Sequence, residues 1–147
     1  MRVLLDSNVY LSFLLNPAAP NAPQTCVVHV LDQRISCIVS RSILDELKRN
    51  VLTKPYLRDR ISPNRLDSFL TLIDMQVGIA ADPPGKPLRA TRDPGDDFVI
   101  ALALHHDVHI IITGDKDLLV LDPIGKMRII SPSAFAALIA PDLAEPS

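Results

Sequence analysis

Short apolar runs alternate with longer segments in which apolar residues recur at helical spacing. Five of the apolar runs have the length of buried strands, namely 3–5, 35–39, 77–81, 110–113 and 127–130. The segments between them predict helices over 9–15, 24–32, 40–52, 54–60, 63–73, 93–104 and 132–139. Strands that alternate with helices predict an α/β fold, in which helices cover both faces of a parallel sheet.

A chain of 147 residues is long enough for one domain with a sizeable core. We expect that domain to span residues 1–140, and residues 141–147 to form a short C-terminal tail. Hydrophobic residues make up 48% and charged residues 22%, which excludes global disorder. The formal net charge of -2 excludes a simple basic nucleic-acid binder. No targeting segment and no apolar run of membrane-spanning length is visible, so we expect a soluble cytoplasmic protein.

Carboxylates gather where the chain passes from predicted strands into turns or helices. They are Asp6, Asp96, Asp97, Asp115 and Asp117. The carboxyl ends of parallel strands meet at one edge of a sheet, so these side chains are expected to lie close together. Two such charges about 4 Å apart repel by roughly 4 kcal/mol at an effective dielectric near 20. A divalent cation offsets that repulsion, and the pattern therefore predicts a magnesium or manganese site.

Asp6 and Glu46 each have a simpler structural interpretation. Asp6 could serve only as the N-cap of the helix that follows it, although Ser7 or Asn8 could cap while Asp6 binds metal. Glu46 lies beside the apolar stripe of its predicted helix and could simply bond Arg49 or the start of that helix. The residues alone leave both alternatives open.

The other candidate ligands form two pairs that are close in the sequence, Asp96 with Asp97 and Asp115 with Asp117. Asp96 and Asp97 cannot both face one metal, because adjacent helical residues point about 100° apart. We expect Asp97 to be the ligand, because Asp96 fills the third helical position, where it favours the positive end of the helix. Either Asp115 or Asp117 could bind metal, and Lys116 between them could contact phosphate.

The loop before this helix is rich in proline and basic residues. Lys86, Arg89 and Arg92 could track the backbone of a nucleic acid, although we favour the simpler interpretation as solvated surface charge.

Read together, four segments resemble the PIN-domain family of metal-dependent ribonucleases. The resemblance is carried by Val3-Leu4-Leu5-Asp6-Ser7-Asn8-Val9, Ser42-Ile43-Leu44-Asp45-Glu46-Leu47, Arg92-Asp93-Pro94-Gly95-Asp96-Asp97 and Ile111-Ile112-Thr113-Gly114-Asp115-Lys116-Asp117-Leu118-Leu119. Each segment is weak alone, but the four occur in the family's order and span almost the whole chain. The chain looks most like the bacterial branch described as toxin components of toxin–antitoxin pairs.

The resemblance implies a three-layer α/β/α sandwich with a central, mainly parallel five-stranded sheet. It also implies a quartet of catalytic and metal-binding acids, which matches Asp6, Glu46, Asp97 and Asp115 here, with Asp117 as an auxiliary metal ligand. Ser7 or Asn8 and Thr113 match polar positions near the centre of the family's site.

The activity implied is Mg²⁺- or Mn²⁺-dependent hydrolysis of RNA phosphodiester bonds. The expected partners are RNA, a small antitoxin protein and further copies of this chain. The alternative is a non-catalytic module that binds RNA or a protein partner while keeping the nuclease fold. A phospho-acceptor receiver domain is disfavoured, because no lysine follows the fifth predicted strand before Ser131.

Overall fold

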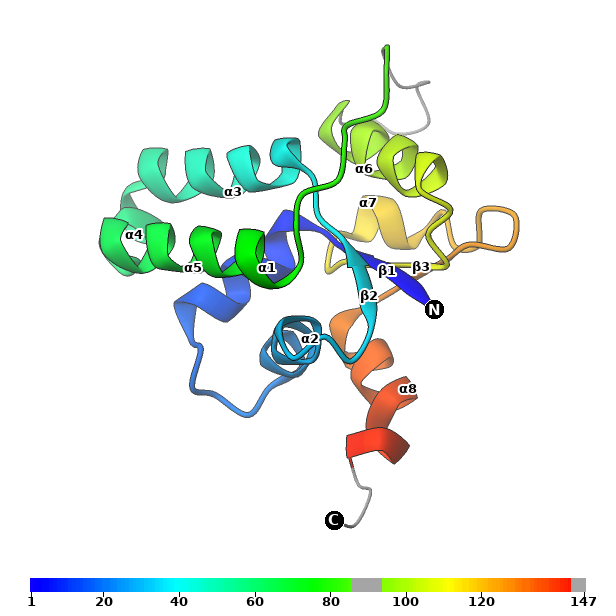
Figure 1. Cartoon of the computed structure of the whole chain (residues 1–147), viewed down its shortest axis with the longest axis horizontal. Helices are drawn as coiled ribbons and strands as arrows, with labels where there is room; N and C mark the ends of the chain where they lie inside the picture. Colours follow the sequence, from blue (N-terminus) through cyan, green and yellow to red (C-terminus); the bar gives the residue numbers. More distant parts are fainter. Residues whose placement is uncertain (86–93, 144–147) are drawn as a thin grey trace.

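The computed structural model describes residues 1–85 and 94–143, and its centre is a parallel four-stranded sheet (Figure 1). The strands are β1 (Arg2–Leu5), β2 (Ser36–Ile38), β3 (Ile110–Ile112) and β4 (Arg128–Ile130). They lie in the order β2-β1-β3-β4, with Leu4 opposite both Ile38 and Ile111. Because β1 is central and parallel to both neighbours, its carboxyl end lies beside the carboxyl end of β3.

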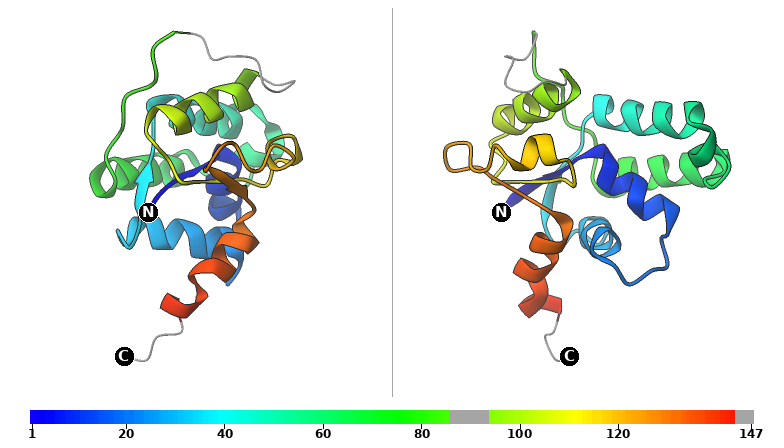
Figure 2. Two further views of the ribbon diagram at one scale, coloured as in Figure 1. Left: turned by 90° about the vertical axis from the view of Figure 1, so that its right-hand side faces the viewer. Right: turned by 180° about the vertical axis from the view of Figure 1, so that it is seen from behind.

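Helices cover both faces of the sheet, as the alternating pattern predicts. The helices are α1 (Ser7–Leu15), α2 (Ala22–Leu31), α3 (Arg41–Thr53), α4 (Pro55–Arg58), α5 (Pro63–Gln76), α6 (Pro94–His105), α7 (Lys116–Leu119) and α8 (Pro132–Leu143). In two perpendicular views, α6 and α7 lie on one side of the sheet, and α2 and α8 lie on the other (Figures 1 and 2). The helices α3 to α5 extend to one side of the sheet as an arm. This confirms the expected three-layer α/β/α architecture.

The core is aliphatic because aromatic residues are few. The β1 residues Val3, Leu4 and Leu5 are fully buried, as are Ile111 and Ile112 of β3. Strands that are apolar at successive positions are covered on both faces, so β1 and β3 form the rigid centre from which the following acids project.

The sheet in the described residues has one strand fewer than the sequence predicts. The segment 77–81 forms only an isolated parallel bridge between Ala80 and Ser40, where the Ala80 N–H donates to the Val39 carbonyl at 2.7 Å. Gly78 has a φ of +81°, a left-handed conformation that interrupts an extended strand. Pro83 and Pro84 then follow, and neither has an N–H to continue a ladder.

Other boundaries also differ from the expected ones. Helix α8 continues to Leu143, four residues beyond the helix end expected at residue 139. The division into a domain and a short tail stays a prediction. The basic loop residues, and Asp93 at the expected start of the next helix, lie outside the described residues. Among the described helices, none has the length and apolar character needed to cross a membrane.

Candidate metal centre

Asp6 stands at the junction of β1 and α1, at the carboxyl edge of the sheet. Its backbone N–H donates to the Ile112 carbonyl at 3.0 Å, which continues the pairing of β1 with β3. Its side chain is the N-cap of α1, where Oδ1 accepts from the Ser7 N–H at 2.8 Å. Oδ2 accepts from the Asn8 amide at 3.0 Å and from the Thr113 hydroxyl at 2.9 Å. Asp6 therefore caps a helix and still lies in the acidic cluster, so the two interpretations coexist.

Thr113 connects the ends of β1 and β3. It is fully buried, and its hydroxyl donates to Asp6 while accepting from the backbone N–H of Asp115 at 3.0 Å. Asp115 in turn caps α7, because its Oδ1 accepts from the Asp117 N–H at 2.9 Å. The threonine hydroxyl thus fixes the turn that carries Asp115 relative to Asp6.

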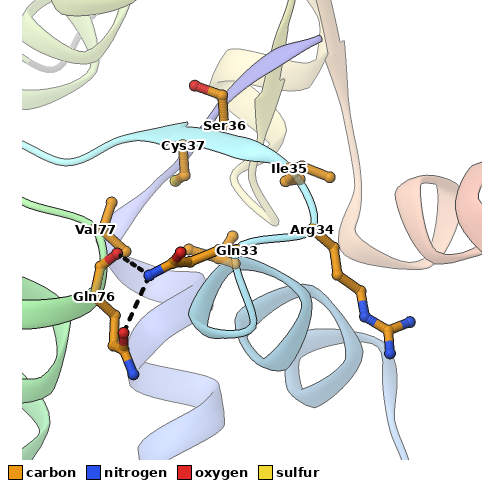
Figure 3. A pocket seen from close by; sticks show the side chains of 8 residues that line it. Gln33, Arg34, Ile35, Ser36, Cys37, Gln76 and Val77 are labelled. Atoms are coloured by element: carbon orange, nitrogen blue, oxygen red, sulfur yellow. Dashed lines mark hydrogen bonds between the residues drawn. The ribbon is translucent and has the colours of Figure 1, made fainter.

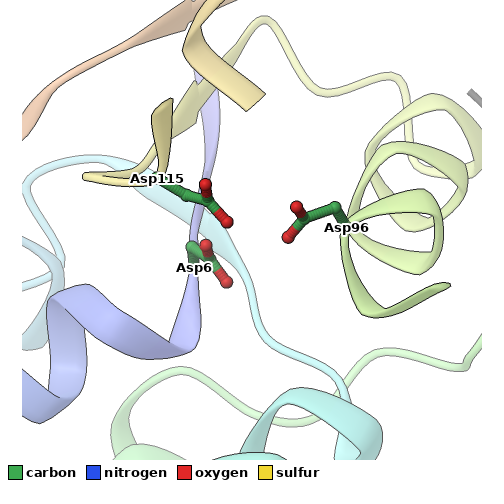
Figure 4. Close-up of side chains that lie close together, drawn as sticks. All are labelled: Asp6, Asp96 and Asp115. Atoms are coloured by element: carbon green, nitrogen blue, oxygen red, sulfur yellow. The ribbon is translucent and has the colours of Figure 1, made fainter. Parts of the chain in front are cut away.

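Asp96 brings a third carboxylate from α6. One carboxylate oxygen each of Asp6, Asp96 and Asp115 lies within 4.8 Å of the other two. In Figure 4 the Asp96 side chain points from α6 toward the other two across the end of the sheet. Asp6 and Asp96 are each only 6% exposed, so this is a recessed cluster and not a group of solvated surface acids.

This arrangement differs from the expectation for α6, which gave the ligand position to Asp97 and a capping role to Asp96. Helix α6 begins at Pro94, and Asp96 of its first turn belongs to the group of three. The assignment of Asp97 as a metal ligand stays a prediction. Asp97 is buried but does not belong to the group of three. The spacing showed that only one of two adjacent residues could face the site, but the rotation of the helix is set by its packing, which the spacing does not reveal.

Glu46 and Asp117 lie at the margin of this cluster. Glu46 is a half-buried residue of α3, and its charge raises the pKa of Asp6. Asp117 is half-buried in the first turn of α7, where its N–H bonds Asp115. Neither belongs to the group of three, so their assignment as ligands stays a prediction.

The electrostatics of Asp6 fit a cation site. Burial raises its pKa to about 6, and the charges of Glu46 and Asp115 act in the same direction. Hydrogen bonds from Thr113 and Ser7 lower it but do not cancel the burial. Three converging carboxylates offer only hard oxygen donors, which are the donors that Mg²⁺ and Mn²⁺ prefer. The residues present therefore fit a divalent metal ion.

A recess at the opposite edge of the sheet offers no comparable chemistry. It has a volume of about 350 Å³ and lies beside the start of β2, where Gln33 donates to the carbonyl and side-chain oxygens of Gln76 at 2.9 and 3.1 Å (Figure 3). Its cysteine, Cys37, is kept as a thiol because burial raises its pKa to about 11. The acidic edge is consequently the better candidate for a reactive site.

A parallel α/β sandwich with acids converging at the carboxyl ends of its central strands is a fold and a site typical of metal-dependent phosphate chemistry. The family model described as "PIN domain" matches residues 2–117. The chain therefore belongs to the PIN domain family, whose members are generally metal-dependent nucleases.

Two individual proteins are similar to this chain. The uncharacterized protein MJ1680 of Methanocaldococcus jannaschii is 33% identical over 122 residues, which are 82% of this chain and 75% of that protein. The crystal structure of VapBC2 from Rickettsia felis, bound to a DNA fragment from its promoter, contains a chain that matches with a TM-score of 0.58. That match covers 89% of this chain and 98% of the other at 13% identity, a likeness that concerns the fold.

Proposed function

We propose that this protein is a Mg²⁺- or Mn²⁺-dependent endoribonuclease that hydrolyses RNA phosphodiester bonds. The observation that carries the proposal is the group of three carboxylates within 4.8 Å, in a chain of the PIN domain family. Membership of the PIN domain family supports a metal-dependent nuclease in general. The recessed acidic cluster supports a catalytic role over a purely binding one.

Asp6, Asp96 and Asp115 would hold the metal, and Glu46, whose charge acts on Asp6, would bind it directly or through water. A bound divalent ion supplies two things here, a more acidic water and neutralisation of charge on the scissile phosphate. Thr113 fixes Asp6 relative to the Asp115 turn through its two hydrogen bonds. Asp97 and Asp117 are proposed as supporting acids at the margin of the site.

In the proposed hydrolysis, an oxygen–phosphorus bond forms from water and the bond from phosphorus to the ribose O3′ breaks. The proton released from water ends on the departing O3′, so the products are a 5′-phosphate and a 3′-hydroxyl. One of the carboxylates would orient the attacking water by accepting its hydrogen bond.

The test is cleavage of a panel of structured and single-stranded RNAs with Mn²⁺, with Mg²⁺ and with EDTA. We expect cleavage by the wild type with either metal, none with EDTA and none by Asp6→Asn with metal. Wild-type Mn²⁺ binding without cleavage of any RNA would favour the non-catalytic module that keeps the nuclease fold. Cleavage by Asp6→Asn at the wild-type rate would overturn the assignment of the site.

We also propose that the protein acts in the cytoplasm as the toxin of a toxin–antitoxin pair, bound by a small antitoxin protein and assembled as a homo-oligomer. The support is the fold shared with a chain of the VapBC2 crystal structure. Expression of the chain alone should arrest growth of the host, and Asp6→Asn should relieve the arrest. Light scattering of the purified protein tests the oligomer, with a single monomeric mass contradicting it.

A further inference from the structure

An open pocket of about 320 Å³ adjoins the acidic cluster on one side. It is lined by Asn8, Val9, Ser12, Pro23, Gly114, Asp115 and Pro132. Asp115 belongs to both the pocket and the group of three carboxylates, so a molecule held by the cluster meets the pocket directly. The volume lies at the lower end of the range of about 300–1,000 Å³ for small-molecule sites.

The walls of the pocket are apolar and rigid. Pro23 lies in the first turn of α2 and Pro132 begins α8, and proline fixes its own φ. The start of α8 is joined to α2 because the Cys26 thiol donates to the Pro132 carbonyl at 3.7 Å. A flat ring can therefore lie between preformed surfaces without the cost of ordering them.

The polar groups of the pocket lie where α1 meets the acidic edge. Asn8 donates to Asp6, and its Oδ1 accepts from the Gly114 N–H at 3.4 Å, so its amide plane is fixed. Ser12 lies one helical turn further along α1, and its exposed side chain supplies a hydroxyl for hydrogen bonding.

The charge of the pocket decides which part of an RNA it can hold. Its charged lining residue is the acidic Asp115, which disfavours a second phosphate. An uncharged, flat group with hydrogen-bonding edges fits apolar walls with polar groups on one side. Proteins recognise single-stranded RNA through splayed bases that stack on flat side chains and form hydrogen bonds at their edges. In this pocket the apolar surfaces come from Val9, Pro23 and Pro132, and the hydrogen-bonding groups come from Asn8 and Ser12.

We propose that this pocket is a base subsite, which holds the nucleobase of a nucleotide adjoining the scissile phosphate of single-stranded RNA. The proposal rests on the proposed ribonuclease function. It adds that the enzyme selects single-stranded RNA and prefers some bases over others at that one position.

Gly114 offers a way to fill the pocket without disturbing the fold. A Cβ placed there would have Asn8 Oδ1, at 4.0 Å, as its nearest contact, and the φ of Gly114 is not in the left-handed range. The protein therefore accommodates a Cβ at this position. We expect the methyl groups of Gly114→Val to take space from the ligand. Ser12→Leu fills the pocket from α1, and Ser68→Leu, at an exposed position inside α5, is the matched control.

The experiment measures binding of a fluorescein-labelled single-stranded RNA in Ca²⁺, and of the same RNA with an abasic nucleotide at each position in turn. We expect one abasic position to weaken wild-type binding about tenfold. Gly114→Val and Ser12→Leu should bind the intact RNA about tenfold more weakly and lose sensitivity to that position. Ser68→Leu should behave as the wild type, and Mn²⁺ should stabilise all four proteins equally against heat.

Cleavage of the same RNAs in Mn²⁺ separates the two proposals. If RNA binding by the wild type depends on the pocket but no RNA is cleaved, the base subsite is retained and the proposed nuclease function is wrong. If the wild type cleaves RNA, and Gly114→Val and Ser12→Leu behave like Ser68→Leu, the proposed base subsite is wrong and the proposed nuclease function is retained. Absence of RNA binding by the wild type would also overturn the subsite.

Discussion

Asp6 and Asp122 each accept hydrogen bonds from a backbone N–H and from a side chain, but their environments act on them in opposite directions. Asp122 receives the Arg128 Nε and Nη2 at 2.9 and 3.0 Å and the Ile129 N–H at 2.7 Å, and these bonds lower its pKa. Asp6 receives hydrogen bonds of similar length, but burial and two neighbouring acids raise its pKa to about 6.

The difference shows at which of the two aspartates a bound cation would compensate negative charge that the protein leaves uncompensated. At Asp122 the chain supplies its own guanidinium, so the carboxylate is already neutralised at the surface. At Asp6 the charges that act on the carboxylate are those of Glu46 and Asp115, which are negative. A bound metal ion is therefore more strongly stabilised at the acidic edge than at Asp122, and variants of the two aspartates should differ accordingly.

The largest expected effect is on cleavage. Asp6→Asn should lower Mn²⁺-dependent RNA cleavage by at least about 1,000-fold, because it removes a buried charge of the proposed metal site. Asp122→Asn should leave the rate within about twofold, because Asp122 is not part of the acidic group. Initial rates on one labelled RNA measure both, and circular dichroism checks the fold. Equal losses in the two variants would contradict the comparison.

The second effect is on stability as a function of pH in metal-free protein. Asp6 has a pKa of about 6 when folded and 3.8 in its ordinary state, so between these values the folded protein binds more protons than the unfolded one. The free energy of unfolding should therefore fall by about 3 kcal/mol as the pH rises through this window. Urea unfolding in EDTA from pH 3.5 to 7, for the wild type and for Asp6→Asn, isolates this contribution. Parallel curves for the two proteins would contradict the buried-acid description.

The third effect concerns the connection between the two strands. Thr113→Val keeps the shape of the side chain but removes the hydroxyl that donates to Asp6 and accepts from the Asp115 N–H. Loss of such a supporting contact should weaken Mn²⁺ binding about 10- to 100-fold, measured by calorimetry. Thr25→Val, at a half-buried position of α2 away from the acids, is the control. Unchanged Mn²⁺ affinity in Thr113→Val would show that the strand ends hold the acids without this residue.

The sequence predicted that Asp6 and Asp115 lie close together, because each follows an apolar strand and the carboxyl ends of the two strands meet. It favoured Asp97 over Asp96 as the acid from α6, whereas Asp96 belongs to the group of three. Both residues are buried, and the choice depends on how α6 rotates as it packs over the sheet. The same limit applies to segment 77–81, whose apolar character predicts a strand. The segment forms one isolated bridge, at Ala80, two residues after the left-handed Gly78.

The smallest expected effect is at the aspartate that the chain already neutralises. Asp122→Ala removes the acceptor of the Ile129 N–H within β4 and should cost about 1 kcal/mol of stability at neutral pH. Because the pKa of Asp122 is lowered in the folded state, its contribution is present above its ordinary value of 3.8 and is lost as the pH falls through its folded value. The pH dependence is therefore opposite in sign to that of Asp6, and the added metal ion should not alter it. Thermal unfolding of Asp122→Ala and the wild type at pH 3 and pH 7, each with Mn²⁺ and with EDTA, measures both properties. A stability difference that grew on acidification, or that Mn²⁺ abolished, would show that Asp122 shares the electrostatics of the acidic edge.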